Sequence, residues 1–110
     1  MCAFCRMVIS DRHFAAQLVA KGEEPRFFDD IGCLRDYVAG GAAPQDAVSY
    51  VADHRTGAWV LASRAVYTWS PKVATPMDSH LLAHADDASR GADTLAASGA
   101  RRSFEEVFAR

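Results

Sequence analysis

The sequence predicts an α+β fold of two small units packed together, each with the order strand, strand, helix, strand. Short alternating or apolar runs predict strands in both halves. A capped segment of helical spacing follows the first strands, and the same order of elements recurs later without a repeat of the residues themselves. In a chain of 110 residues neither half can bury a sufficient core alone, so we expect residues 1–54 and 55–110 to form two units that pack together.

The first unit is expected to open with two strands, over residues 7–9 and 14–20, joined by a turn over residues 10–12. The alanines of the second run leave a helix as the alternative there. A third strand is expected within AVSYVADH, residues 47–54, because its side chains alternate between two faces.

The clearest element is a helix that begins after Asp29 or Asp30, since either carboxylate can accept the free backbone N–H groups of a first turn. Gly40 and Gly41 predict its C-terminal end. The apolar residues at helical spacing are Ile31, Leu34, Tyr37 and Val38.

The second unit is expected to repeat this plan. Strands are predicted over residues 58–63 and 65–70, and a proline-bearing loop leads into the apolar strand HLLAHA. A helix over residues 86–99, capped by Asp86 or Asp87, should follow, and residues 101–110 form either a last strand or a frayed helical end. The expected aromatic filling of the core is Phe27, Phe28, Tyr50, Trp59, Tyr67 and Trp69.

Composition excludes several classes of function. The net charge is −2 with both signs scattered, so neither nucleic acid nor an acidic membrane surface is an expected partner. No apolar run approaches the roughly 20 residues needed to span a bilayer. The chain has no phosphate loop and no nucleophile elbow, so we do not expect an enzyme. It also opens without a secretory signal, which leaves a cytosolic protein and a segment downstream of an export leader both open.

The strongest chemical signal is the motif Cys2-x-x-Cys5-x-Met7. Thiolates and thioethers are soft ligands, and the thioether favours Cu(I) over zinc. Thioredoxin-like redox chemistry is less favoured, because no strand precedes the motif. With three cysteines at most one disulfide can form, and Cys2–Cys5 is the best pair.

Met77 is the second candidate, because it lies in a polar loop stiffened by Pro71 and Pro76, where a core role is less expected. The alternative is that Met77 packs against Trp59 and Trp69.

The remaining candidates are weaker. His80 and His84 are four residues apart and share a face, but no glutamate accompanies them, so packed or solvated histidines are the preferred interpretation. His13 and His54 are expected at the surface. Cys33, inside the predicted helix, is expected to be a buried structural thiol.

Four segments in order, CAFCRMVISDRHFAAQL, FFDDIGCLRDY, AWVLASRAVYTWSP and TPMDSHLLAHAD, resemble the NosL family of copper chaperones for nitrous oxide reductase maturation. The resemblance covers nearly the whole chain. It implies a fold of two ββαβ units related to the N-terminal domain of organomercurial lyase. It also implies one Cu(I) ion bound by Cys5, Met7 and Met77. The residues themselves leave Cys2 open as a further ligand, and a supporting role for His80 near Met77 is the less favoured interpretation.

The same resemblance implies partners and a location. A NosL-type protein is a periplasmic lipoprotein that delivers copper toward the copper–sulfide centre of nitrous oxide reductase, in a pathway that includes an ABC-type transporter complex. The lipid anchor is not part of this sequence. A monomer and a metal-bridged dimer are both compatible with such a site.

One departure concerns Arg6, which stands where many family members have glycine, and its guanidinium is expected to lower the pKa of the nearby thiols. Three alternatives stay open. One is a sensor or storage domain for zinc or another soft metal, using Cys2, Cys5 and a histidine. Another is a CxxC thiol–disulfide protein. The third is an organomercurial-lyase-like enzyme, which needs a further catalytic acid or thiol near the first pair of cysteines, a role that Cys33 could fill only if it faced them.

Overall fold

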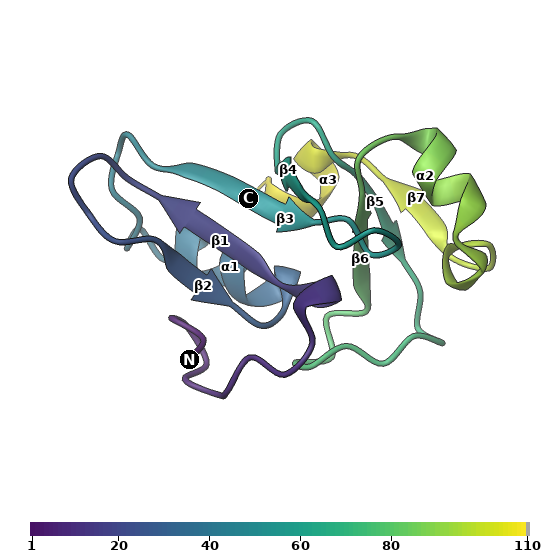
Figure 1. Cartoon of the computed structure of the whole chain (residues 1–110), viewed down its shortest axis with the longest axis horizontal. Helices are drawn as coiled ribbons and strands as arrows, with labels where there is room; N and C mark the ends of the chain where they lie inside the picture. Colours follow the sequence, from purple (N-terminus) through teal and green to yellow (C-terminus); the bar gives the residue numbers. More distant parts are fainter. Residues whose placement is uncertain (110) are drawn as a thin grey trace.

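Two antiparallel sheets organise the chain in the computed structural model, which describes residues 1–109 (Figure 1). The first sheet has the order β2-β1-β3-β4, and the second has the order β6-β5-β7. The strands are β1 Ala16–Val19, β2 Arg26–Phe28, β3 Val48–Ala52, β4 Trp59–Leu61, β5 Val66–Trp69, β6 Leu81–His84 and β7 Ala100–Arg102. The run β1, β2, α1, β3 matches the run β5, β6, α2, β7, so the predicted pair of ββαβ units is confirmed.

Strand β4 departs from the predicted order. Residues 58–63 were expected to open the second unit, but β4 pairs antiparallel with β3, with Trp59 opposite Ala52. The short connection between them favours this pairing, because adjacent strands joined by a tight loop form a hairpin. The sheets therefore change between Leu61 and Val66, and β5 opens the second unit with β6 as its partner. The division into residues 1–54 and 55–110 as folding domains stays a prediction.

Helix α1, Ile31–Ala39, begins and ends where the sequence predicts. The Asp30 carboxylate accepts a hydrogen bond from the Gly32 N–H, 2.8 Å from Oδ1, and Gly40 ends the helix. The expected strand over residues 7–9 is wrong, because this part of the chain is irregular and turns back on itself. The Cys2 N–H donates to the Met7 carbonyl, 2.7 Å away. A short 3-10 turn, η1 at Arg12–Phe14, then leads into β1.

The predicted helix over residues 86–99 is broken at Asp93. Helix α2 covers only Asp87–Ala92, with Asp86 as its cap, and the 3-10 turn η2 covers Thr94–Ala96. The last residues were expected to form either a strand or a helical end, and they form both: strand β7 is followed by helix α3, Phe104–Phe108. Arg110 lies outside the described residues. None of the helices within residues 1–109 is both long and apolar enough to cross a bilayer.

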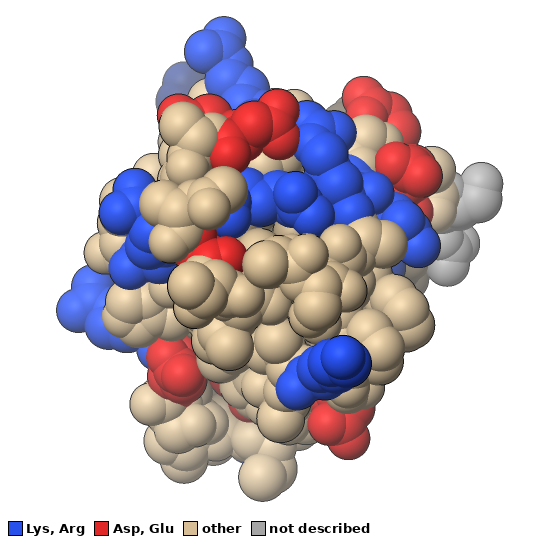
Figure 2. All heavy atoms as spheres, turned by 90° about the vertical axis from the view of Figure 1, so that its right-hand side faces the viewer, with Lys and Arg blue, Asp and Glu red and all other residues tan. Residues whose placement is uncertain are grey.

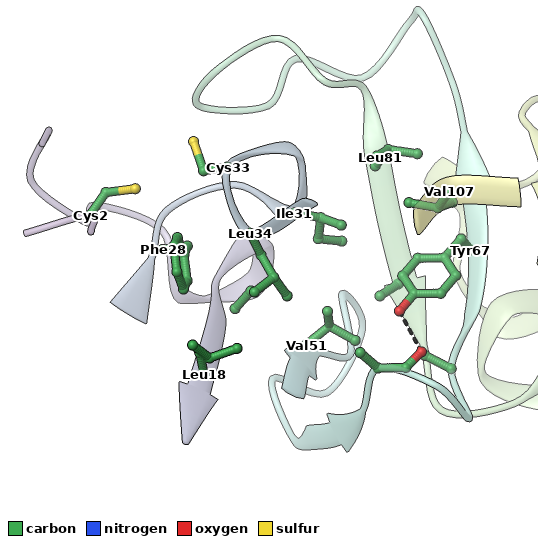
Figure 3. Close-up of a cluster of buried hydrophobic side chains, with 14 residues drawn as sticks. Cys2, Leu18, Phe28, Ile31, Cys33, Leu34, Val51, Tyr67, Leu81 and Val107 are labelled. Atoms are coloured by element: carbon green, nitrogen blue, oxygen red, sulfur yellow. Dashed lines mark hydrogen bonds between the residues drawn. The ribbon is translucent and has the colours of Figure 1, made fainter. Parts of the chain in front are cut away.

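The core joins the two units (Figure 3). Phe28 and Leu34 of the first unit share one buried cluster with Tyr67 of the second, whose hydroxyl donates to the Ala62 carbonyl, 2.7 Å away. Only part of the expected aromatic filling is inside, because successive side chains on a strand point to opposite faces. The aromatic residues that are instead about 40% exposed are Phe27, Trp59 and Trp69.

The fold also gathers basic residues that are scattered in the sequence. Figure 2 shows Lys and Arg side chains in a band across the end that lies at the right of Figure 1, with acidic groups beside it. On the surface of the second unit Arg101 pairs with Asp87, at 2.7 Å. Acidic neighbours thus offset part of the positive charge on this face.

Candidate metal centre

The N-terminal loop brings the first two cysteines together. The Arg6 N–H donates to the Cys2 carbonyl, at 3.0 Å, and the Ala3 N–H donates to the Phe27 carbonyl, at 2.8 Å, which docks the loop on β2. Arg6 lies in the left-handed region, with φ of 68°. The resulting turn points the Cys5 N–H at the Cys2 sulfur, 3.5 Å away.

Helix α1 adds a third sulfur to this pair. Each of Cys2, Cys5, Asp29 and Cys33 offers one ligand atom, and these four atoms all lie within 4.8 Å of one another. All three cysteines are free thiols, so no disulfide joins Cys2 and Cys5. Cys2 and Cys33 are buried at one end of the core (Figure 3). Cys5 is partly exposed.

Asp29 is the acceptor at the centre of the cluster. The Cys5 thiol donates to its Oδ1 atom at 3.3 Å, and the Cys33 thiol approaches the same atom at 3.7 Å. Because both thiols contact the same oxygen atom of Asp29, their sulfur atoms are held close to each other. Three thiols and one carboxylate form a donor set suited to a soft or borderline metal ion.

Both thiols nearest to Asp29 are held in the protonated form. Burial raises the pKa of Cys5, and the hydrogen bonds that its thiol makes with Cys2 and Asp29 raise it further, against a lowering by the Met7 backbone. Burial also raises the pKa of Cys33, and the neighbouring Cys2 adds to that rise. The expectation that Arg6 would leave a thiol with a lowered pKa is therefore wrong for Cys5. Burial of Cys5 is the largest cause of the raised pKa, because desolvation disfavours the thiolate.

The loop that carries Met77 lies against the start of α1. The Met77 N–H donates to Asp30 Oδ2 at 2.8 Å, and the side chain is 46% exposed. Met77 and Cys33 line one pocket of about 160 Å³, which Phe4 also lines. The alternative contact of Met77 with the two tryptophans gains no support from this position.

The other expected ligands lie in different settings. The Met7 side chain is 58% exposed at the end of the N-terminal loop. The His80 Nδ1 atom is 2.9 Å from the Val73 carbonyl, which engages that nitrogen within the loop. The combination of Cys5, Met7 and Met77 as one ligand set stays a prediction.

Cys33 and Asp29 are the residues whose roles the sequence did not reveal. Cys33 is buried as expected, yet its sulfur faces Cys2 and Cys5, which meets the condition that the lyase-like alternative placed on it. No local pattern indicated these roles, because Asp29 precedes the extended cap residue Asp30 and lies outside the helix that carries Cys33.

A second pocket does not share this chemistry. It has a volume of about 280 Å³, and its lining includes Arg35 and Arg102 but no thiol, thioether or imidazole. The remaining lining residues are Trp69, Leu81, Glu106 and Val107. A soft metal ion would find no preferred ligand in this pocket.

The fold and the cluster define the chain as a two-unit α+β protein with a sulfur-rich candidate metal centre. The family model described as NosL matches residues 1–109, and the chain therefore belongs to the NosL family. NosL is a family of accessory proteins with a copper-related role, not a known class of enzyme, and its members are typically extracytoplasmic. Comparison with curated proteins and with solved structures finds no match.

Proposed function

We propose that this protein is a Cu(I) metallochaperone that binds one copper ion and delivers it for maturation of the copper–sulfide centre of nitrous oxide reductase. Membership of the NosL family supports the link to copper. The observation that carries the proposal is the position of Cys5 and the Met77 loop on either side of Cys33, since Cys5 lies in the cluster with Cys33 and Met77 lines a pocket with it. Sulfur donors of both kinds favour the monovalent ion.

The proposed ligands are Cys5, Met7 and Met77, with Cys2 as an optional fourth. Cys5 is partly exposed and both methionine side chains are about half exposed, so an incoming ligand of a partner has access to the ion. A permanent structural site would instead be closed by four protein ligands. Exposure of three sulfurs from two separate loops suits a site that releases its ion.

Copper transfer would proceed by ligand exchange without a change of oxidation state. The Cys5 thiol donates to Asp29 Oδ1, with 3.3 Å between sulfur and oxygen. On binding, Cu(I) would replace this thiol proton, which leaves to solvent, and the thiolate would be protonated again from solvent when the ion departs. A sulfur of the partner then bonds to the ion before the Cys5 bond breaks. The ion therefore passes through a shared-ligand intermediate and is never free in water.

The partners and location belong to the same proposal. The client is nitrous oxide reductase, and the maturation pathway includes an ABC-type transporter complex. The protein would work in the periplasm as a lipoprotein, through an anchor outside this sequence. It would act as a monomer or as a metal-bridged dimer.

The test is an anaerobic Cu(I) titration against a chromophoric chelator. We expect one tightly bound ion per chain, and a loss of affinity of about tenfold or more in Cys5→Ser and in Met77→Ala. Leu95→Ala is the matched control, because Leu95 is a similarly exposed apolar side chain, at 51%, outside the site. Wild-type affinity in Met77→Ala would show that the proposed site across the two units is wrong.

A second candidate function follows from the cluster itself. Cys2, Cys5, Cys33 and Asp29 provide the four ligands of a tetrahedral zinc site, and their ligand atoms already lie within 4.8 Å of one another. This arrangement would suit a sensor or storage domain for zinc or another soft metal. Preference for Zn²⁺ over Cu(I) in direct competition, together with unfolding on addition of a chelator, would favour it.

A further inference from the structure

Three ligating side chains outside the sulfur cluster meet where the two units join. His54 follows β3 of the first unit, while His84 ends β6 and Asp93 lies between α2 and η2 of the second. One ring nitrogen of each histidine and one carboxylate oxygen of Asp93 lie within 4.8 Å of one another. Asp93 Oδ2 is 2.5 Å from His54 Nδ1 and 2.8 Å from His84 Nε2.

We propose that His54, His84 and Asp93 bind a divalent cation of the first transition row, such as Zn²⁺, and that this ion ties the two units together. Two imidazoles, which are borderline ligands, together with one carboxylate suit Zn²⁺ and its neighbours better than Cu(I), Mg²⁺ or Ca²⁺. The set shares no residue with the sulfur cluster, so this proposal is independent of the proposed copper function.

The distances between the three ligand atoms are close to those around a bound zinc ion. Ligands about 2.0–2.1 Å from a tetrahedral zinc ion are about 3.3 Å from one another. The present contacts of 2.5 and 2.8 Å therefore need to open by only about 0.5–0.8 Å. A carboxylate also neutralises half of the charge of a divalent ion, and the fourth position is left for water.

The three side chains are held by packing and enclosed. His84 is fully buried, and the side chains of Asp93 and His54 are 8% and 12% exposed. The His54 ring packs on Phe14, with 5.0 Å between ring centroids, and edge-on to the His84 ring. The narrow exposure of His54 gives an ion its route into the cluster.

Hydrogen bonds around the three side chains hold the backbone of both units where they meet. The His54 N–H donates to the Ala83 carbonyl at 2.8 Å, next to His84. The Leu95 N–H donates to Asp93 Oδ1 at 3.0 Å, which leaves Oδ2 directed at the two imidazoles. Such support from outside the ligand set is typical of metal sites.

The adjacent carboxylate does not compete for the ion, because Asp53 is already saturated. Its Oδ1 accepts from the N–H groups of Arg55 and Thr56, and its Oδ2 accepts from the Ala85 N–H and the Ser89 hydroxyl.

The test is a Co²⁺ titration of the wild-type protein followed by absorption. Cobalt held by nitrogen and oxygen gives ligand-field bands without the sulfur-to-metal charge-transfer bands that thiolate ligands produce. We expect one such ion per chain and a loss of affinity of about tenfold or more in Asp93→Asn. His80→Asn is the control, because His80 lies in the same unit outside the cluster and asparagine tolerates its positive φ of 60°.

A second measurement keeps the test independent of whether Asp93→Asn folds. In nitrogen-15 spectra of the wild-type histidines, saturating Zn²⁺ should shift His54 Nδ1 and His84 Nε2 and leave His80 unchanged. Unmoved ring nitrogens on these two residues, or cobalt spectra that show thiolate binding alone, would overturn the proposal. An Asp93→Asn protein that folds and binds cobalt as the wild type does would overturn it as well.

Discussion

The backbone N–H of Met77 donates a hydrogen bond to Asp30 Oδ2 across 2.8 Å, although 47 residues separate the two. The same carboxylate accepts from the Gly32 N–H at the start of α1 and from the Ser79 hydroxyl. One buried side chain therefore begins the helix that carries Cys33 and holds the loop that carries Met77.

Replacement of this carboxylate should destabilise the protein strongly. Asp30→Ala removes a helix cap and leaves three donors without their acceptor, so we expect a loss of about 3 kcal/mol in the free energy of unfolding. Urea denaturation measures it. Asp36→Ala, at an exposed position of the same helix, is the control and should change stability by less than about 0.5 kcal/mol. Equal effects of the two substitutions would contradict the role of Asp30.

Acid should weaken the joint that Asp53 makes between the units. Burial opposes ionisation of this carboxyl, but hydrogen bonds from the Ala85 and Thr56 N–H groups, the Ser89 hydroxyl and the Arg55 N–H outweigh it and lower the pKa to about 2. A pKa lowered by folding stabilises the protein above the unfolded value, near 3.9, and this stabilisation is lost as the pH falls toward 2.

We therefore expect Asp53→Asn to lose about 2 kcal/mol of stability at pH 7, with a difference from wild type that shrinks below about pH 4. Urea denaturation at several pH values measures this, and the exposed Asp46→Asn is the control. A difference that stays constant from pH 7 to pH 2 would show that the Asp53 charge is not responsible.

Copper affinity should rise with pH. Because burial raises the pKa of Cys5, its thiol is protonated near neutrality and must lose a proton to bind the ion. One such thiol predicts a gain of about tenfold in Cu(I) affinity per pH unit below its pKa. Competition titrations at several pH values measure the slope, which Cys5→Ser should flatten. A wild-type affinity independent of pH would count against Cys5 as a ligand.

Cys33 separates the two candidate functions. If Cu(I) is bound by Cys5, Met7 and Met77, Cys33→Ala should leave the copper affinity within about threefold of wild type. The same substitution should weaken zinc binding by about tenfold or more, because it removes one of the four candidate ligands Cys2, Cys5, Cys33 and Asp29. Parallel titrations with both ions give the comparison, and a large loss for copper would place Cys33 in the copper site.

Arg6 holds a backbone conformation that glycine adopts more easily. A non-glycine residue in the left-handed region costs about 1–2 kcal/mol, and the greater flexibility of unfolded glycine offsets part of the gain. Arg6→Gly should therefore raise the free energy of unfolding by up to about 1 kcal/mol. Arg6→Val should lower it, because a β-branched side chain is poorly tolerated at positive φ. A loss of stability in Arg6→Gly would contradict this account.

Local patterns predicted the elements whose causes lie within a few residues. Helix α1 runs from its Asp30 cap to Gly40 as expected, because capping bonds and the helical period act within four positions. The strand predicted over residues 7–9 is wrong because strand formation, unlike helix capping, depends on a partner elsewhere in the chain. An apolar run becomes a strand only where a neighbouring strand pairs with its backbone. Here the Met7 carbonyl instead accepts a hydrogen bond from the Cys2 N–H within the same loop.

By itself the sequence determined the α+β class, the doubled ββαβ order and the resemblance to NosL, since these depend on local pattern and on motifs in order along the chain. Only the tertiary structure decided that β4 joins the first sheet, that Cys33 meets Cys2 and Cys5, and that His54 reaches Asp93. The physical reason is distance along the chain. Contacts such as Cys5 with Asp29, 24 residues apart, and His54 with Asp93, 39 apart, depend on how whole elements pack, which no short window of residues encodes.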